Sequence, residues 1–346
     1  MIKGGLAAVS TGDDSFAWAG AAGWADLAKN VPLTVETPFF IASITKMFTA
    51  TLVMLLCEQQ QSSLDDPMSQ YLPAALIEGI HVYRGTDYTD QVQIRHLLGH
   101  TSGIADYYLE KPSGEKSFFG LVVAGDASER TAEDTVVRAR EKLAANFAPG
   151  KKASYADTNY QLLGFIIEAV TGKPLHEVYR ELIFAPLGMT DTYLYTRSEP
   201  ITPQVKEVAH IYYQDIDLTH NEALKTQWAD GGLVATCADC LRFLKALHSG
   251  GIFQDDATLP LMQQWRPLEF PISYGLGTMR MKLPWIFSPF NPIPELQGHF
   301  GSTGTGLFFC EELDVYVVGV TNQVESRTQL VRFIIGIMKL MKKLDR

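Results

Sequence analysis

Long apolar runs, basic charge and cysteine are all scarce in this chain of 346 residues. No uncharged apolar run reaches about 18 residues, the length that a transmembrane helix requires, so we expect no membrane span. Acidic residues outnumber basic ones by 39 to 29, and the net charge of −10 argues against a nucleic-acid-binding surface. The remaining composition, 46% hydrophobic and 20% charged, is that of an ordinary globular protein.

The four cysteines give little support for a metal or redox site. Cys237 and Cys240 have the spacing of a zinc-binding or redox pair, but they open an apolar helical pattern without a second pair nearby. His96 and His100 lie four residues apart, as metal ligands on a helix do, without an obvious third ligand. We therefore expect structural roles for both pairs and no metal, while a metallohydrolase using His96, His100 and His299 stays as an alternative.

The N-terminal segment lacks the apolar core of a signal peptide. This is the pattern expected of a protein that stays in the cytoplasm, or of a periplasmic or extracellular protein whose leader has been removed. The sequence contains no internal repeat and no low-complexity tract.

Hydrophobic periodicity predicts strands at both ends of the chain and helices between them. The expected strands are 5–10, 15–20, 277–281, 298–301, 306–310 and 315–322. The longest expected helices are 43–60, 131–146, 159–171, 175–184, 237–247 and 324–341. We therefore predict a single α+β domain of two lobes with a catalytic cleft between them. An antiparallel sheet flanked by terminal helices would come from about 1–40 and 270–346, and a mostly helical lobe from about 41–269.

The most informative segment is the Ser-x-x-Lys string formed by Ser43 and Lys46. A serine hydroxyl is a weak nucleophile at neutral pH and needs a neighbouring base. On the predicted helix, a lysine three residues after the serine lies on the same face. The unpaired N–H groups at the helix start would favour an alkoxide on Ser43. The simpler alternative is a serine that only caps the helix.

A second candidate group is formed by Tyr155 and Asp157, which follow a Pro-Gly turn. A phenol has a reference pKa near 10, and a nearby Lys46 cation would lower it toward the range of a proton shuttle. The polar side chain two residues later could contact a substrate amide. The alternative is a surface tyrosine that leads into a helix.

The third candidate group lies in the glycine-rich stretch that contains His299, Gly301 and Ser302. His299 could orient a substrate carboxylate or a catalytic proton. Gly301 lets a ligand approach the backbone closely, and Ser302 is of interest for its backbone N–H. The alternative is a glycine-rich turn with an incidental histidine.

These three groups occur in the order of the class C β-lactamase and D-alanyl-D-alanine carboxypeptidase family of serine hydrolases, which includes the family VIII esterases and resembles penicillin-binding proteins. The resemblance covers about residues 5–340. It also rests on shorter connecting phrases in the segments 64–73, 94–103, 163–174, 186–189 and 231–234.

The resemblance implies a β-lactamase/transpeptidase-like fold and a serine acyl transfer without metal or organic cofactor. Ser43 would attack a carbonyl to form an acyl-enzyme, and Lys46 and Tyr155 would share the proton transfers. The backbone N–H groups of Ser43 and Ser302 would form the oxyanion hole. The substrate would be a small or short peptide-like ester or amide.

Two residues depart from the family pattern. Asp157 stands where Asn is most common, and an ionised Asp only accepts hydrogen bonds. His299 stands where the efficient β-lactamases have Lys, and a histidine is mostly neutral at pH 7. Both departures favour an esterase or weak peptidase over a strong β-lactamase. Substrate choice is expected to depend on residues 104–130 and on the aromatic loop 283–294.

A catalytically silent penicillin-binding sensor or assembly module of the same fold remains the alternative function. The presence of Ser43, Lys46 and Tyr155 disfavours it, because a lost nucleophile is the simplest sign of a silent module.

Overall fold

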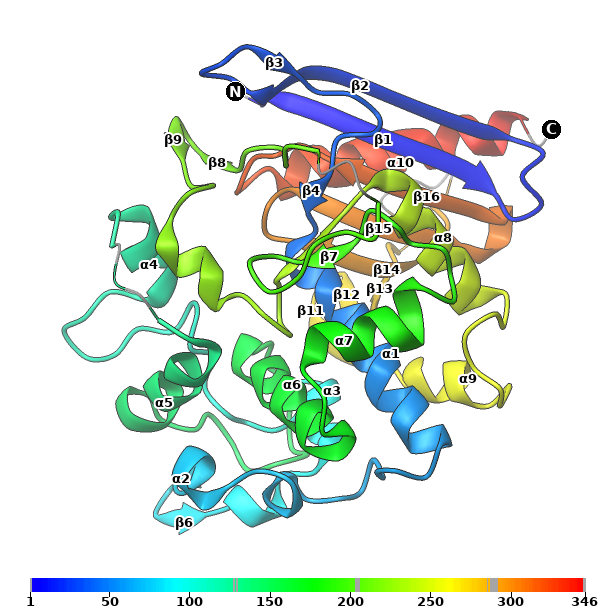
Figure 1. The fold of residues 1–346 in the computed structure, drawn as a ribbon. Helices are drawn as coiled ribbons and strands as arrows, with labels where there is room; N and C mark the ends of the chain where they lie inside the picture. Colours follow the sequence, from blue (N-terminus) through cyan, green and yellow to red (C-terminus); the bar gives the residue numbers. More distant parts are fainter. Residues whose placement is uncertain are drawn as a thin grey trace.

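A computed structural model of the chain describes residues 2–126, 128, 130–202, 206–284, 286 and 292–344. Within these residues, one large antiparallel sheet lies beside a cluster of helices (Figure 1). Its strands, in spatial order, are β11 (Arg266–Glu269), β12 (Ile272–Tyr274), β13 (Met279–Met281), β14 (Leu296–Gly301), β15 (Thr305–Cys310), β16 (Val315–Val320), β1 (Gly4–Thr11), β2 (Ala17–Asp26) and β3 (Val31–Pro32).

The two ends of the chain meet in this sheet, as the α+β prediction requires. Strand β1 pairs with β16 on one side and with β2 on the other, so that Leu6 lies opposite Val320. Strand β16 consists mainly of valine and is buried along its whole length. β-Branched residues suit such a position because they pack well on a pleated surface that is covered on both faces.

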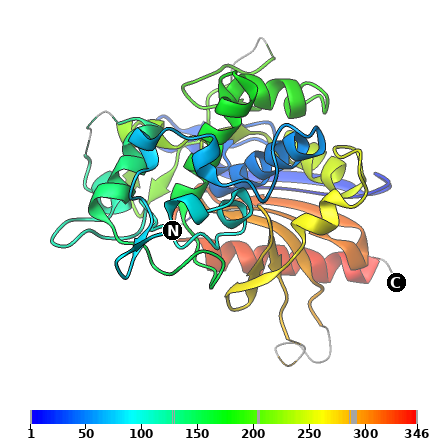
Figure 2. The same ribbon diagram turned by 90° about the horizontal axis from the view of Figure 1, so that it is seen from below.

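The helices pack on both faces of the sheet and fill the second part of the molecule. They are α1 (Thr45–Glu58), α2 (Ala74–Ile77), α3 (Ile94–Leu98), α4 (Phe118–Val123), α5 (Ala132–Lys142), α6 (Asp157–Thr171), α7 (Leu175–Tyr179), α8 (Cys237–His248), α9 (Thr258–Met262) and α10 (Arg327–Leu344). Figure 2 shows α10 along one face of the sheet and α1 on the opposite side. None of the described helices has the length and apolar composition of a membrane span.

One detail of the predicted sheet lobe is wrong. Terminal helices were expected to flank the sheet, and only α10 is terminal. The other face of the sheet is covered by α8, which packs on β1, β15 and β16 and comes from the middle of the chain. An amphipathic helix can occupy this place from anywhere in the sequence, because only its apolar face is required there.

Element boundaries differ from the predictions by a few residues. Helix α5 ends at Lys142 and not at residue 146, and the predicted helix 175–184 is α7 followed by the π-helical turn Arg180–Phe184. Strand β2 continues to Asp26, six residues beyond its predicted end. Such ends are set by tertiary contacts more than by local sequence pattern.

The first turn of α1 lies at the junction of the sheet and the helices. Helix α1 is preceded by the 3₁₀ turn Ala42–Ile44, which packs against β14 and β15. A small sheet of β4 (Phe39–Phe40), β10 (Leu233–Ala235) and β7 (Tyr193–Leu194) supports the chain just before this turn. Residues of the sheet, of α1 and of α6 therefore meet at one place.

Candidate active site

Ser43 lies in the middle of the 3₁₀ turn that leads into α1. The turn is fixed from outside, because the N–H of Ile41 donates to the oxygen of Leu233 in β10 at 3.0 Å. Ala42 has a φ of +47°, a costly conformation for a residue with a side chain, which persists only where surrounding contacts enforce it. Ser43 itself is half-buried. Its hydroxyl is therefore held in place and remains accessible.

Lys46 lies in the first turn of α1, and its side chain is completely buried. Its ammonium donates to Ser43 Oγ at 3.2 Å, to the backbone oxygen of Asp230 at 2.7 Å and to Oδ1 of Asp157. Burial alone favours the neutral amine, but the charges of Asp157 and Asp230 outweigh it and raise the pKa of Lys46 above its usual range. Lys46 is therefore protonated, with all three of its N–H donors in use.

Tyr155 precedes α6 and faces the same site. Its ring centroid lies 5.0 Å from Lys46 Nζ and 4.2 Å from the ring of His100. The phenol oxygen is buried, and this burial raises the pKa of Tyr155 above 10 although Lys46 and Ser43 act in the opposite direction. Lys46 does lower this pKa, as expected. The expected net decrease is wrong, because the loss of hydration raises the pKa by more than one cation lowers it.

Asp157 is the first residue of α6, and two further buried carboxyl groups lie around it. Asp106 accepts the N–H of Asp157 at 2.9 Å, and Asp230 accepts the hydroxyl of Tyr107 at 2.7 Å. Burial and the charge of Asp157 raise the pKa of both Asp106 and Asp230. Sequence analysis missed these two residues, because neither stands in a recognisable motif. The expected contact of Asp157 with substrate stays a prediction, while its carboxylate is paired with Lys46.

His299, in β14, is completely buried. Its Nδ1 lies 2.6 Å from the carbonyl oxygen of Phe300 and must donate to it, so Nε2 accepts from the hydroxyl of Tyr274 at 3.1 Å. Burial and the charge of Lys46 lower the pKa of His299 to about 3. The histidine is therefore neutral with both nitrogens occupied, and it offers no cation to a substrate carboxylate.

Gly301 lets β14 lie against the 3₁₀ turn Ala42–Ile44, which carries Ser43 and is called the nucleophile turn below. A Cβ atom at this position would lie 2.5 Å from the oxygen of Ile41 and 2.1 Å from the hydroxyl of Thr305. The close approach that excludes a side chain is therefore made by the protein's own backbone. Ser302 follows on the same side of the turn, where its backbone N–H remains a predicted oxyanion donor together with that of Ser43.

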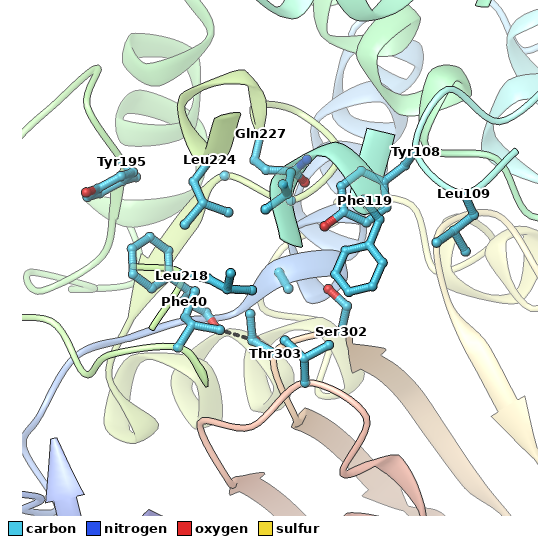
Figure 3. Close-up of a pocket in the computed structure, with 16 residues that line it drawn as sticks. Phe40, Tyr108, Leu109, Phe119, Tyr195, Leu218, Leu224, Gln227, Ser302 and Thr303 are labelled. Atoms are coloured by element: carbon cyan, nitrogen blue, oxygen red, sulfur yellow. Dashed lines mark hydrogen bonds between the residues drawn. The ribbon is translucent and has the colours of Figure 1, made fainter. Parts of the chain in front are cut away.

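A largely apolar cavity opens beside the nucleophile turn (Figure 3). Its volume is about 140 Å³, and both Ala42 and Ser302 line it. Phe40 and Tyr195 lie on one side, with ring centroids 4.8 Å apart, and Tyr108 and Phe119 lie on the other. The remaining wall residues are Leu109, Val122, Ile211, Leu218, Leu224, Gln227, Gly231, Gly232, Thr303 and Val324.

One of the two segments that were expected to determine substrate choice contributes to the cavity wall. Tyr108, Leu109, Phe119 and Val122 all come from the segment 104–130, which was expected to determine substrate choice. Half of the other proposed segment, 283–294, lies outside the described residues. Its contribution therefore stays a prediction.

The residues considered as metal ligands take part in local hydrogen bonds or are buried. His96 Nδ1 accepts the N–H of Gln93, and His100 Nδ1 accepts the N–H of Ala156, each at 3.1 Å. Cys237 and Cys240 are buried free thiols in α8. The predicted structural role of His100 is thus visible in the geometry, because it ties the 99–103 turn to the loop that carries Tyr155.

Among the described residues, one other group brings possible metal ligands together. Asp26, Glu207 and His210 place three such atoms within 4.8 Å of one another. The ammonium of Lys29 lies 3.2 Å from Asp26 and 3.1 Å from Glu207, so both carboxylates already have a cation.

In this fold a fixed serine, a buried lysine and a tyrosine meet between a sheet and a helical lobe. A family model described as Beta-lactamase matches residues 2–334, and the chain belongs to this family. The chain is similar to penicillin-binding protein 4* of Bacillus subtilis strain 168, with 29% identity over 284 residues, which are 76% of this chain and 56% of that protein.

Two further relatives carry names of hydrolases. The teichoic acid D-alanine hydrolase of Staphylococcus aureus is 26% identical over 258 residues, covering 74% of this chain and 57% of that protein. The structure of D-amino acid amidase from Ochrobactrum anthropi SV3, complexed with L-phenylalanine, matches with a TM-score of 0.81 and 26% identity, covering all of this chain and 95% of that one. The chain spans a little over half the length of the curated relatives it matches.

Proposed function

We propose that this protein hydrolyses small amides or esters of amino acids that carry a free amino group and an apolar side chain, through an acyl-enzyme on Ser43. The observation that carries this proposal is the contrast between the charged groups around Lys46 and the uncharged wall of the cavity. Lys46 is the cation of the site, and it is already paired with Asp157.

The cavity supports an apolar acyl group. A dry apolar cavity of roughly 150 Å³ is known to bind benzene, and the 140 Å³ found here is of that size. Its facing aromatic walls, Phe40 and Tyr195 against Tyr108 and Phe119, suit a second ring in edge-to-face contact. A phenylalanine-sized side chain is therefore a reasonable test ligand.

Charge supports an ammonium group over a carboxylate on the substrate. None of the described residues that line the cavity carries a positive charge. His299 is neutral, and the carboxyl groups of Asp106, Asp157 and Asp230 exceed the single charge of Lys46. A substrate carboxylate, as in penicillins or in peptides ending in D-alanine, would meet a field of its own sign.

The names of the relatives agree with this substrate class. A D-amino acid amidase acts on an amino acid amide, and a teichoic acid D-alanine hydrolase releases an amino acid. Both names denote hydrolysis of a bond to an aminoacyl group. The configuration at the α-carbon follows from neither the cavity nor the charges, so both enantiomers belong in the test.

In the proposed acylation, Ser43 is the nucleophile, and Lys46 and Tyr155 transfer its proton. Ser43 Oγ attacks the substrate carbonyl carbon while its proton passes into the group formed with Lys46 and Tyr155. The developing oxyanion accepts from the backbone N–H groups of Ser43 and Ser302, an interaction whose loss costs on the order of 10²–10³ in rate. Tyr155, as a neutral phenol, donates a proton to the leaving nitrogen or oxygen. Water then attacks the acyl-enzyme and releases the acid.

Three kinds of substrate that differ in charge test the proposal. We would measure hydrolysis of D- and L-phenylalanine amide, of p-nitrophenyl butyrate and of benzylpenicillin, with wild type and Ser43→Ala in parallel. We expect turnover of one phenylalanine amide and of the ester, a loss of at least about 10³-fold in Ser43→Ala, and the lowest kcat/KM for benzylpenicillin.

Intact-protein mass measured during the same reactions locates the acyl group. An added mass on the wild type and not on Ser43→Ala supports the acyl-enzyme. Efficient turnover of benzylpenicillin with no turnover of the amides would overturn the substrate class. Absence of Ser43-dependent turnover with every substrate would overturn the hydrolase and favour the silent module.

A further inference from the structure

The hydrogen bonds around Lys46 leave the proposed nucleophile without a ready base. Lys46 is protonated, and its three N–H donors go to Ser43 Oγ, Asp157 Oδ1 and the backbone oxygen of Asp230. An ammonium with three donated bonds has no lone pair with which to accept a proton. Tyr155 is a neutral phenol in a buried position and is no better as an acceptor.

Asp157, which contacts Lys46, can take a proton from it and so provide Ser43 with a base. Its carboxylate pairs with the same ammonium that donates to Ser43, so that Ser43, Lys46 and Asp157 form a continuous chain of donors and acceptors. The side chain is almost fully buried at the start of α6, where little water competes for its proton. An asparagine, which the family resemblance leads one to expect here, cannot hold a proton.

We propose that Asp157 stores the proton that Lys46 must release, and so makes Lys46 the base for Ser43. The inference rests on the proposed function and makes Asp157 a positioning residue that acts through Lys46, in place of its predicted contact with substrate.

The proton transfers balance within the site. An N–H bond of Lys46 breaks and an O–H bond forms on Asp157, which leaves a neutral amine and a neutral acid. Rotation about the Cε–Nζ bond of Lys46 turns the amine lone pair toward Ser43. The amine then takes the Ser43 proton as Oγ bonds to the carbonyl carbon. On collapse, the leaving group takes a proton from Tyr155, Lys46 restores the phenol, and Asp157 returns its proton to Lys46.

The resting state keeps the proton on Lys46, and two features of the surroundings lower the cost of moving it to Asp157. The carboxyl groups that face Lys46 and Asp157 are Asp106 and Asp230, whose pKa values are raised by burial and by the charge of Asp157. A proton on Asp157 removes that repulsion. An ion pair out of water also loses hydration on both partners, so the neutral pair is less disfavoured than in solvent.

The other titratable neighbours do not compete for the proton. The imidazoles are His100 and His299, and burial lowers the pKa of each so that both stay neutral. Burial also raises the pKa of each phenol on the elements packed around the pair, which are Tyr107, Tyr108, Tyr155, Tyr160, Tyr179 and Tyr274. They therefore keep their own protons at working pH.

The pH dependence of Asp157→Asn tests the proposal, with p-nitrophenyl butyrate as a neutral substrate. In the wild type, activity needs the one proton that Lys46 and Asp157 share through their hydrogen bond. In Asp157→Asn, Lys46 must be deprotonated by solvent before it can act. We expect kcat to fall about 10²–10³-fold at neutral pH, the acid limb to move upward by more than about one pH unit, and KM to change little.

A matched variant separates this effect from damage to the fold. Asp239 in α8 is another fully buried carboxyl group, hydrogen-bonded to Thr192 and Arg242. Asp239→Asn should lower the melting temperature and leave the acid limb in place. Addition of formate to Asp157→Ala should restore activity in a saturable manner, because a small carboxylate can replace the lost group.

Other outcomes would overturn the proposal. A raised KM with an unmoved acid limb would show that Asp157 contacts substrate, and an unchanged kcat would remove it from the proton transfers. If Asp157→Asn does not fold, Asp157→Glu must keep the wild-type limb at a lower kcat. Absence of any Ser43-dependent turnover in the wild type would instead refute the proposed function.

Discussion

The two sides of Ser43 differ in almost every physical property. On the α1 side, Lys46 is completely buried, all its donors are used, and charges lie within hydrogen-bonding distance of one another. On the other side, the cavity is open to substrate, nearly apolar and free of cations in the described wall. One side is a fixed polar network and the other is a shaped apolar surface.

The difference teaches how the proposed reaction divides its tasks. Proton transfer needs groups held at fixed distances in a dry site, where electrostatic interactions are strong and an unpaired charge is costly. Recognition of an apolar side chain needs only complementary shape and area. Substitutions on the polar side should therefore change kcat and stability together, while substitutions in the cavity should change the choice of substrate.

The largest expected effect comes from breaking the charged side at Lys46. Lys46→Met keeps the length of the side chain but leaves Asp157 buried without its cation. We expect activity to fall by at least about 10³-fold and the free energy of unfolding, measured in urea, to fall by about 3–5 kcal/mol.

The double variant Lys46→Met/Asp157→Asn is the control for this prediction. It removes the stranded charge and should recover most of the stability without recovering activity. A single variant as stable as the wild type would contradict the strength assigned to this ion pair.

A smaller loss of activity is expected for Tyr155→Phe. The raised pKa keeps the phenol protonated between about pH 6 and 9, so it acts as a donor throughout this window. Removal of the hydroxyl should lower kcat by about 10²-fold, by the same factor at each pH. Tyr108→Phe, which removes a hydroxyl from the cavity wall, is the comparison variant. A factor that grows with pH would instead identify the phenolate of Tyr155 as a base.

The polar side is also the part of the site that the sequence allowed us to predict. Ser43 and Lys46 are three residues apart, in the 3₁₀ turn and in the first turn of α1 that continues it, so their proximity follows from helical geometry. Tyr155 was found through a motif, but the net rise of its pKa was not expected, since burial cannot be read from neighbouring residues. Asp106 and Asp230 were missed because their place beside Asp157 depends on contacts between distant segments.

The cavity could not be predicted to the same extent. Its walls come from β4, from the segment around α4, and from chain near residues 195, 224 and 324. No local pattern marks such residues, because apolar side chains at a surface hollow look like core residues in a sequence. The sheet was predicted far better, since the short, nearly continuous apolar runs of β16 and β1 are typical of buried strands.

A substitution that fills the cavity tests whether the cavity side of Ser43 determines the choice of substrate. Leu224 lies in the cavity wall, and Leu224→Trp would occupy the space meant for a large acyl group. We expect kcat/KM for a phenylalanine amide to fall by about 10–100-fold while p-nitrophenyl acetate is hydrolysed almost normally. Leu224→Ala enlarges the cavity and should allow acyl groups larger than that of phenylalanine to be hydrolysed. Equal losses with both substrates would mean that the cavity does not hold the acyl group.

The smallest effect is expected at His299, which stands on the polar side without a charge to contribute. His299→Gln keeps a donor and an acceptor near Phe300 and Tyr274, so we expect a loss of about 1 kcal/mol in stability and less than about tenfold in kcat. Because its pKa is lowered to about 3, the neutral form prevails above that pH, and the pH profile from about 5 to 8 should not move. The loss should also be equal for phenylalanine amide and for benzylpenicillin. A selective loss with benzylpenicillin would show that His299 binds the substrate carboxylate after all, and would move the proposed function back toward the penicillin-binding relatives.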